Sequence, residues 1–309
     1  MSGQVVAAGV VQVVGGVLLA PLLPGLIQHI KGRLQGRRGP SPWQPYRELR
    51  RLWSRSPVDP EGVTIVYRLA PPLVAACVGG ALLLLPIAGL SPAWPLGHDA
   101  LVLVSLFALA RFASAVSSWD TSGGFGLMGA SRDLALAVSV EGLLLAVLTA
   151  AALPTRSTDL LVLSDAGVGA AAWASPAHWL TALAFTLVVV AETGRQPIDN
   201  PDTHLELTMI HEGPLLEYGG RDLALLQWAA AARHWIVLVL AIELFAPRPA
   251  DFAARIAVLA VGLPLLCGAL ALVESWQAKM RILRVPRLLA TGGGLCMLGL
   301  VTWFFGGRM

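Results

Sequence analysis

The stretch at residues 133–153 reads DLALAVSVEGLLLAVLTAAAL, and it decides the fold class of the chain. A helix needs about 20 predominantly apolar residues to cross a hydrocarbon core of ~30 Å. Because a backbone in lipid must satisfy its own hydrogen bonds, such a stretch is predicted to be helical. Similar stretches lie at residues 4–28, 68–90, 99–119, 173–194, 223–246, 252–275 and 286–305. We therefore expect an all-α polytopic membrane protein, a single transmembrane domain over residues 1–309 with about eight transmembrane helices.

The composition of the chain excludes an ordinary soluble protein. Of its 309 residues, 56% are hydrophobic and 13% are charged, and the mean hydropathy is +0.69. A surface that faces water on all sides needs many more charged residues than this. The formal net charge of +3 is also too small to indicate a nucleic-acid partner. This composition predicts that the chain lies in a lipid bilayer.

The cysteine and histidine patterns do not indicate a metal site. Cys77, Cys267 and Cys296 stand singly within apolar stretches, whereas iron–sulfur clusters and structural zinc need closely spaced ligands. The stretch HEGPL that begins at His211 lacks the H-E-x-x-H spacing, and its proline would disturb the helix that such a site needs. We expect His204 and His211 to be solvated or interface residues.

The distribution of basic residues predicts the orientation of the chain. Fifteen Lys and Arg residues fall in alternate loops and their flanks, and three, Arg156, Arg248 and Arg308, fall in the loops and ends of the opposite face. Basic residues concentrate on the cytoplasmic side of membrane proteins. We therefore expect both termini outside and cytoplasmic loops at about 29–67, 120–132, 195–222 and 276–285.

Two of these loops differ in character. Residues 45–54 read PYRELRRLWS, which places apolar side chains on one side of a short amphipathic cytoplasmic helix that anionic lipid could hold at the interface. Residues 192–222, in contrast, contain seven of the 19 acidic residues of the chain and only Arg195 and Arg221 as basic residues. This acidic loop is predicted to face a partner other than lipid phosphate.

Carboxylates within apolar stretches are the next candidates for function. An ionised carboxylate at membrane depth is unfavourable by several kcal/mol unless it pairs, contacts water or is protonated. Glu192, Glu243 and Glu274 lie close enough to span ends to reach the interface, whereas Glu141 lies about two turns deeper than Asp133. Glu141 is therefore the strongest candidate for a functional carboxylate.

Two basic residues, Arg111 and Arg233, also lie within predicted spans. Each of them could stretch to the cytoplasmic interface, or it could pair with a carboxylate on a neighbouring helix. The sequence leaves both alternatives open.

Three stretches resemble one family, the membrane subunit that complex I shares with energy-converting nickel–iron hydrogenases. The first, KGRLQGRRGPSPWQP at 31–45, is similar to the family's R-x-Q-x-R-x-G-P motif followed by L-Q-P. The second, GASRDLALAVSVE at 129–141, has the family's spacing of arginine, serine and buried glutamate at Arg132, Ser139 and Glu141. The third, AETGRQPIDNPDTHLELTMIHEGPLLEY at 191–218, resembles the A-E-T-x-R-x-P-F-D signature.

The continuation of the third stretch is similar to the formate hydrogenlyase and hydrogenase branch of that family. Ile198 stands where many complex I members have phenylalanine. Gln227 lies near a position where those complex I members often have glutamate. Both differences weaken a literal transfer of the quinone pocket and of every proton-channel carboxylate, whereas the hydrogenase interpretation tolerates them.

The resemblance implies a membrane anchor and proton-coupling subunit of a formate hydrogenlyase-like or energy-converting hydrogenase in the bacterial inner membrane. The chain itself would hold no cofactor and have no activity alone. Its partners would be soluble iron–sulfur and hydrogenase-type subunits, which carry the clusters and the nickel–iron site, and antiporter-like membrane subunits. The implied proton-coupling residues are Glu141, Glu192, Asp133 and Glu243. The implied residues for docking the soluble arm, or for a quinone-like pocket, are Arg33, Gln35, Arg37, Arg132, Arg195, Asp199, Asp202, Glu206, Glu212 and Glu217.

Two alternative functions remain open at this point. The first is the quinone-chamber subunit of a complex I-like NADH/quinone oxidoreductase, in which quinone would bind along Arg37, Arg195 and Asp199. The second is an independent secondary transporter, which is expected to contain internal repeats. The sequence contains no recognisable repeat.

Overall fold

The computed structural model describes residues 3–89, 99–166, 170–199, 210–247, 249 and 251–306. Over these residues the chain is helical and contains no strand, apart from an isolated bridge between Asp99 and Asp159. The helices are α1 (Gly3–Leu19), α2 (Leu22–Leu34), α3 (Gln44–Trp53), α4 (Ile65–Leu84), α5 (Ala100–Asp120), α6 (Gly124–Ala152), α7 (Leu160–Ala166), α8 (Ala170–Ala174), α9 (Pro176–Glu192), α10 (Gly220–Phe245), α11 (Phe252–Trp276) and α12 (Val285–Gly306). Two short 3-10 helices, η1 (Gly213–Leu215) and η2 (Ile282–Arg284), precede α10 and α12. The predicted all-α fold is confirmed.

Seven helical segments of the described chain are long and apolar enough to cross a membrane. They are Gln12–Leu34, Ile65–Leu84, Ala100–Asp120, Gly124–Ala152, Gly220–Phe245, Phe252–Trp276 and Ile282–Phe305. The eighth predicted span, at 173–194, corresponds to α9, which has 17 residues. It is shorter than predicted because Pro176, which has no amide hydrogen to donate, begins a new helix after Ser175. The chain is thus a polytopic membrane protein, whose described residues form seven long apolar helices and a shorter one, α9.

The ends of two other spans differ from the prediction. The first span has a turn at Ala20 and Pro21, where the proline cannot donate a helical hydrogen bond, and α2 then continues to Leu34. Helix α6 begins at Gly124, so that most of the predicted loop at 120–132 is helical. Gly129 and Gly213 allow this extension to pack closely on η1, since a Cβ atom on Gly129 would lie 2.7 Å from the Cα atom of Gly213.

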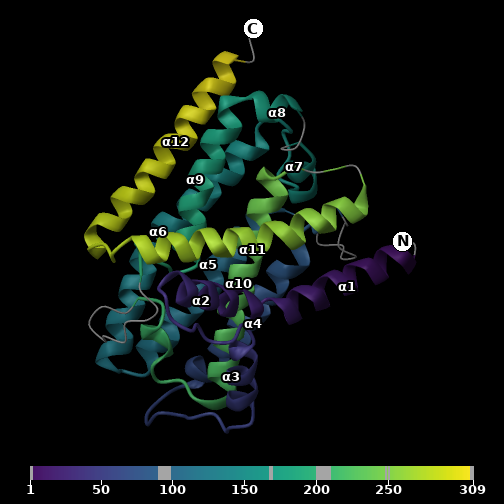
Figure 1. Ribbon diagram of the computed structural model, residues 1–309. Coiled ribbons are helices and arrows are strands. Elements are labelled where there is room, and N and C mark those ends of the chain that lie inside the picture. Colours follow the sequence, from purple (N-terminus) through teal and green to yellow (C-terminus); the bar gives the residue numbers. More distant parts are fainter. Residues whose placement is uncertain are drawn as a thin grey trace.

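Helix α10 forms the centre of the bundle and passes through the middle of the molecule (Figure 1). Its residues from Trp235 to Leu240 are all at most 7% exposed, and it packs against α4, α9, α11 and α3. Helix α5 packs between α4 and α6, α12 packs on α9 and α6, and α11 packs on α2. Large apolar side chains such as Leu265 and Phe305 are exposed on α11 and α12, as expected for helices that face lipid.

Helix α3 is the predicted amphipathic helix, and Figure 1 shows it at the end of the molecule opposite α7 and α8. Proline in its first turn favours the start of a helix, and Gln44 Nε2 donates a hydrogen bond of 3.0 Å to Glu48 Oε1. Trp43 and Trp53 at its two ends are more than half exposed. This arrangement suits a helix at a membrane interface, and its contact with lipid stays a prediction.

Candidate functional site

Four charged residues from four helices meet inside the bundle and form an arginine–glutamate cluster, which consists of Arg111 of α5, Glu141 of α6, Glu192 of α9 and Arg233 of α10. Arg111 Nη2 lies 2.9 Å from Glu192 Oε2, and Arg233 Nη1 lies 3.5 Å from the same oxygen. Arg111 Nη1 lies 3.8 Å from Glu141 Oε1. The two arginines therefore pair with carboxylates on neighbouring helices, which decides between the alternatives that the sequence left open.

The members of the arginine–glutamate cluster differ in burial. The side chain of Glu192 is 0% exposed and that of Arg111 is 4% exposed, whereas Arg233 and Glu141 are 14% and 16% exposed. Arg233 Nη2 also donates a hydrogen bond of 2.8 Å to the carbonyl of Phe107, and its guanidinium lies 4.5 Å from the centre of the Phe107 ring. Two arginines and two carboxylates balance in charge only when both carboxylates are ionised, so that one added proton leaves a buried net positive charge.

A second pair connects helix α6 with the acidic loop. His211 Nδ1 lies 3.0 Å from Asp133 Oδ1, and the backbone amide of His211 donates to Asp199 Oδ2 at 3.3 Å. Burial lowers the pKa of His211, but the neighbouring carboxylate of Asp133 raises it more, so that the pKa lies above its ordinary value of 6.5. The contact with Asp133 therefore favours the protonated form of His211.

Gly194 leaves the space that the ring of His211 occupies. Its φ is +59°, which favours glycine, and a Cβ atom at this position would lie 2.5 Å from His211 Cδ2. Gly142 on α6 has a different environment, since a Cβ atom there would have no neighbour within 4 Å.

We predict that Gly194→Ala destabilises the protein by about 1–3 kcal/mol, because the backbone is strained and the imidazole must move. Thermal unfolding of the purified protein in detergent measures this loss. Gly142→Ala is the matched control and should be neutral or slightly stabilising, because alanine favours the helix. Equal unfolding temperatures for the two variants would contradict the close approach of Gly194 to His211.

The Glu274 triad joins the signature stretch after α9 to two other helices; it consists of Lys31 of α2, Glu274 of α11 and Arg195. Lys31 Nζ lies 2.9 Å from Glu274 Oε1, and Arg195 Nη1 lies 3.1 Å from Glu274 Oε2. The three side chains are at most 7% exposed. Glu274, for which the sequence suggested an exposed position at the span end, is therefore buried and paired.

Two further contacts hold the same stretch at the end of α11. Lys279 Nζ lies 2.7 Å from Asp199 Oδ1, and the amide of Met280 donates to the carbonyl of Pro197 at 2.8 Å. Ile198 between them is 2% exposed. Sequence reasoning missed Lys31, Glu274 and Lys279 as site residues. The signal was present, since Lys31 opens the first motif and Glu274 follows a long apolar run, but their proximity depends on how the helices pack.

Glu243 lies apart from the arginine–glutamate cluster. Glu243 is on α10 ten residues after Arg233, about 15 Å along the helix, and it accepts a hydrogen bond of 2.7 Å from the Ala88 amide. Arg33, Gln35 and Arg37 are exposed at and after the end of α2. Arg132 and Glu212 are partly buried and Glu217 is exposed, whereas Asp202 and Glu206 lie outside the described residues.

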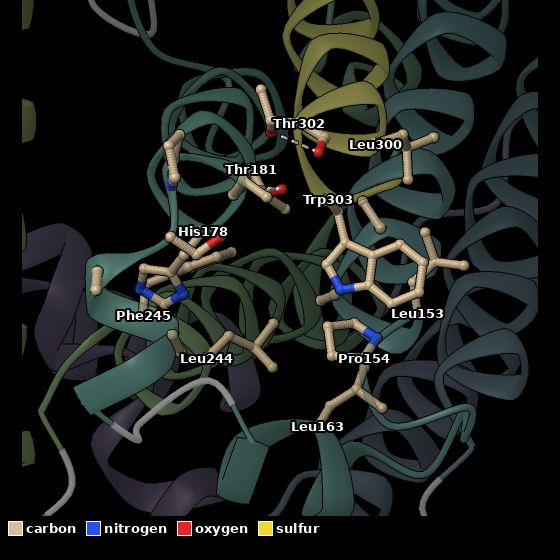
Figure 2. Close-up of a pocket in the computed structure, with 18 residues that line it drawn as sticks. Leu153, Pro154, Leu163, His178, Thr181, Leu244, Phe245, Leu300, Thr302 and Trp303 are labelled. Atoms are coloured by element: carbon tan, nitrogen blue, oxygen red, sulfur yellow. Dashed lines mark hydrogen bonds between the residues drawn. The ribbon is translucent and has the colours of Figure 1, made fainter. Parts of the chain in front are cut away.

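A cavity of about 650 Å³ lies at the end of the bundle where α7 and α8 are found. Figure 2 shows His178, Thr181, Leu244, Phe245 and Trp303 pointing into it from α9, α10 and α12. Its lining contains no Lys, Arg, Asp or Glu residue. The cavity is therefore separate from the charged groups described above.

No group of three or more His, Cys, Asp or Glu side chains in the described parts of the chain is arranged to hold a metal ion. Cys77, Cys267 and Cys296 are buried as free thiols.

Comparison with known proteins gives a consistent result. The family described as NADH dehydrogenase matches residues 7–304. Hydrogenase-4 component C of Escherichia coli (strain K12) is 32% identical over 312 residues, which cover 98% of either chain. Formate hydrogenlyase subunit 4 of the same organism is 31% identical over 300 residues, which cover 92% of this chain and 94% of that protein. A chain in the structure of the membrane-bound sulfane sulfur reductase, an archaeal respiratory membrane complex, has a similar fold, with a TM-score of 0.82, 17% identity and coverage of 96% of this chain and 99% of that chain.

Proposed function

The chain belongs to the NADH dehydrogenase family, the membrane subunit 1 family of complex I, and from that premise we propose that it is the membrane anchor and proton-coupling subunit of a formate hydrogenlyase-like or energy-converting hydrogenase. The similarity to subunits of hydrogenase-4 and formate hydrogenlyase over nearly the whole chain supports this branch of the family. The subunit would hold no redox centre. The nickel–iron site and the iron–sulfur clusters would belong to soluble partner subunits, and antiporter-like subunits would lie beside it in the membrane.

The arginine–glutamate cluster is the observation that carries the proton-coupling role. Glu192 has a close arginine contact of 2.9 Å and no exposed side-chain surface. Glu141 is 16% exposed and lies 3.8 Å from Arg111, and it has no shorter contact with either arginine among the described residues. Glu141 is therefore the carboxylate that exchanges a proton with the smaller loss of pairing energy.

The docking role rests on the position of the signature stretch. Arg195 contacts Glu274 and Asp199 contacts Lys279, so that the start of the acidic loop is fixed to the membrane helices. A soluble arm bound to the rest of this loop through Asp202, Glu206, Glu212 and Glu217 would thus act on a rigidly connected segment. A change of charge at the base of the arm could then reach the buried carboxylates through electrostatic interaction over a short distance.

The quinone alternative finds less support in these contacts. It requires Arg195 and Asp199 to face a head group, but both side chains are at most 7% exposed and engaged in ion pairs. Arg37, the third residue of the expected path, is exposed after the end of α2. We therefore retain the hydrogenase proposal.

We predict that Glu141→Gln leaves assembly and redox turnover with artificial acceptors intact, and reduces proton movement in sealed vesicles about tenfold or more. Glutamine keeps the shape and the hydrogen-bonding capacity but cannot release a proton. General acid–base groups typically contribute ~10²–10⁴-fold, and water can replace part of that contribution. The measurement is proton movement per substrate turnover by the intact complex.

Thr149→Ala on the same helix is the control for this experiment. The Thr149 hydroxyl donates only to carbonyls of its own helix, so its loss should leave proton movement unchanged. Wild-type proton movement in the Glu141→Gln complex would refute the proton-coupling role. If the Glu141→Gln complex does not assemble at all, Glu141 is instead a structural residue.

The orientation can be tested with single cysteines. A cysteine at Thr203 should react with an impermeant reagent only from the cytoplasmic side, and one at Asp165, which is exposed, only from outside. The native thiols should give little background because all three are buried. The reverse labelling pattern would contradict both the orientation and the docking role.

A further inference from the structure

His211 lies at the boundary between the membrane helices and the acidic loop. Its Nδ1 faces Asp133 on α6 at 3.0 Å, while its backbone amide donates to Asp199 at the start of the loop. The side chain of His211 is 30% exposed, whereas that of Asp133 is 9% exposed. One edge of the imidazole thus contacts a buried carboxylate, while other atoms of the side chain are exposed.

The second ring nitrogen of His211 is unusual. Nε2 is buried and has no hydrogen-bond partner among the described residues. A buried polar atom without a partner is unfavourable by about 1–3 kcal/mol, and such atoms in folded proteins call for a functional or solvent partner. His211 therefore has one nitrogen that is committed to Asp133 and one that is available for proton exchange.

Charged and titratable groups from three helices and the loop act on this imidazole. They are Asp133 of α6, Arg111 of α5, Asp199 of the loop and the neutral His234 of α10. The carboxylate of Asp133 more than offsets the effect of burial, so that the pKa of His211 is above 6.5. The protonated ring is thus favoured over a wider pH range than in a free imidazole.

We propose that His211 is a proton-relay residue between the acidic loop and the buried carboxylates of the membrane helices. This inference rests on the proposed proton-coupling function and adds the route by which a proton enters or leaves. In the inward direction, the neutral ring carries its proton on Nδ1 and takes up a second proton at Nε2. It then transfers the Nδ1 proton to Oδ1 of Asp133, so that one proton enters and one leaves the ring.

The ring is then neutral with its proton on Nε2, and a flip of the imidazole returns a protonated nitrogen to the side of Asp133. Asp133 releases its proton to the next group and becomes ionised again, which completes the cycle without any net change in the residues. Gly194 borders the ring at this edge, and a Cβ atom there would lie 2.5 Å from Cδ2, so that a larger residue would hinder the flip.

His211→Asn in the intact complex tests the relay. The Nδ2 of asparagine can replace Nδ1 as the donor to Asp133, but the amide does not titrate. We expect the complex to assemble, to keep redox turnover with artificial acceptors, and to lose about tenfold or more of its proton movement in sealed vesicles. We also expect wild-type proton movement to decline as the pH rises through the raised pKa of His211, and this decline to be absent in His211→Asn.

Two comparisons make the outcome decisive. His178→Gln changes a partly buried histidine that lines the separate apolar cavity, and it should leave proton movement and its pH dependence unchanged. Wild-type proton movement and pH dependence in His211→Asn would overturn the relay. The Glu141→Gln complex then tests the proton-coupling function separately. Reduced proton movement in that complex would support the function even if the relay through His211 is wrong. If neither His211→Asn nor His211→Gln assembles, the residue is structural and the relay is refuted.

Discussion

Glu274→Leu is expected to prevent the protein from accumulating in the membrane as a folded subunit. Glu274 has no exposed side-chain surface and is the common partner of Lys31 and Arg195. Leucine at this position would leave two cations buried without that partner. Removing one partner of a buried ion pair is destabilising by about 3–5 kcal/mol, a large part of a total stability of ~5–15 kcal/mol. Yield in membranes and thermal unfolding in detergent measure the effect.

Two variants separate this effect from a simple packing defect. Ser275→Ala alters the next residue, whose hydroxyl donates only to the Ala271 carbonyl, and it should change stability little. The triple variant Lys31→Met, Arg195→Met and Glu274→Leu replaces all three charges by apolar groups and should recover much of the loss. A Glu274→Leu protein as stable as the wild type would show that the Glu274 triad does not hold the signature stretch in place.

Arg111→Met is expected to destabilise the protein by about 3–5 kcal/mol, because it removes a buried counter-ion shared by two carboxylates. Glu192 would keep only Arg233 at 3.5 Å, and Glu141 would lose its contact of 3.8 Å. Arg68→Met is the matched control. The Arg68–Asp59 contact is similarly short at 3.0 Å, but the two side chains are 58% and 43% exposed, so its loss should be within ~1 kcal/mol.

The double variant Arg111→Met with Glu192→Gln tests whether charge balance causes this effect. It leaves one arginine and one carboxylate, Arg233 and Glu141, in the arginine–glutamate cluster. Residues in one buried network typically show interaction free energies of ~0.5–3 kcal/mol, so the double variant should be more stable than the sum of the single losses predicts. Strict additivity of the free energies of unfolding would mean that Arg111 and Glu192 act independently.

The fold class could be predicted because the signal for a transmembrane helix is local. The length of an apolar stretch identifies the helix without any knowledge of its neighbours. The ends of helices were harder to predict. Residues 124–132 continue α6 although they include three glycines and Arg132, because a helix can extend beyond the apolar stretch when no proline interrupts it. The start of α9 could have been predicted from Pro176, which favours the first turn of a helix.

The candidate site could be predicted only in part. A carboxylate in an apolar stretch identifies Glu141 by itself, but the partner of Glu192 lies 81 residues away in the sequence, on a helix whose position depends on packing. The same holds for Lys31 and Glu274, which are separated by 243 residues. The sequence also grouped Glu243 with the other carboxylates. The structure places Glu243 near the C-terminal end of α10, where it accepts a hydrogen bond from the Ala88 amide. Its role in proton coupling stays a prediction.

The shortness of α9 has a consequence for the surrounding bilayer. A helix of 17 residues is about 26 Å long, which is less than the ~30 Å thickness of a hydrocarbon core. Lipid adapts to such hydrophobic mismatch by becoming locally thinner. Because Glu192 ends this helix, the aqueous phase should come nearer to the buried carboxylates here than beside the longer helices, and the distance that a proton must travel through the low-dielectric interior becomes correspondingly shorter.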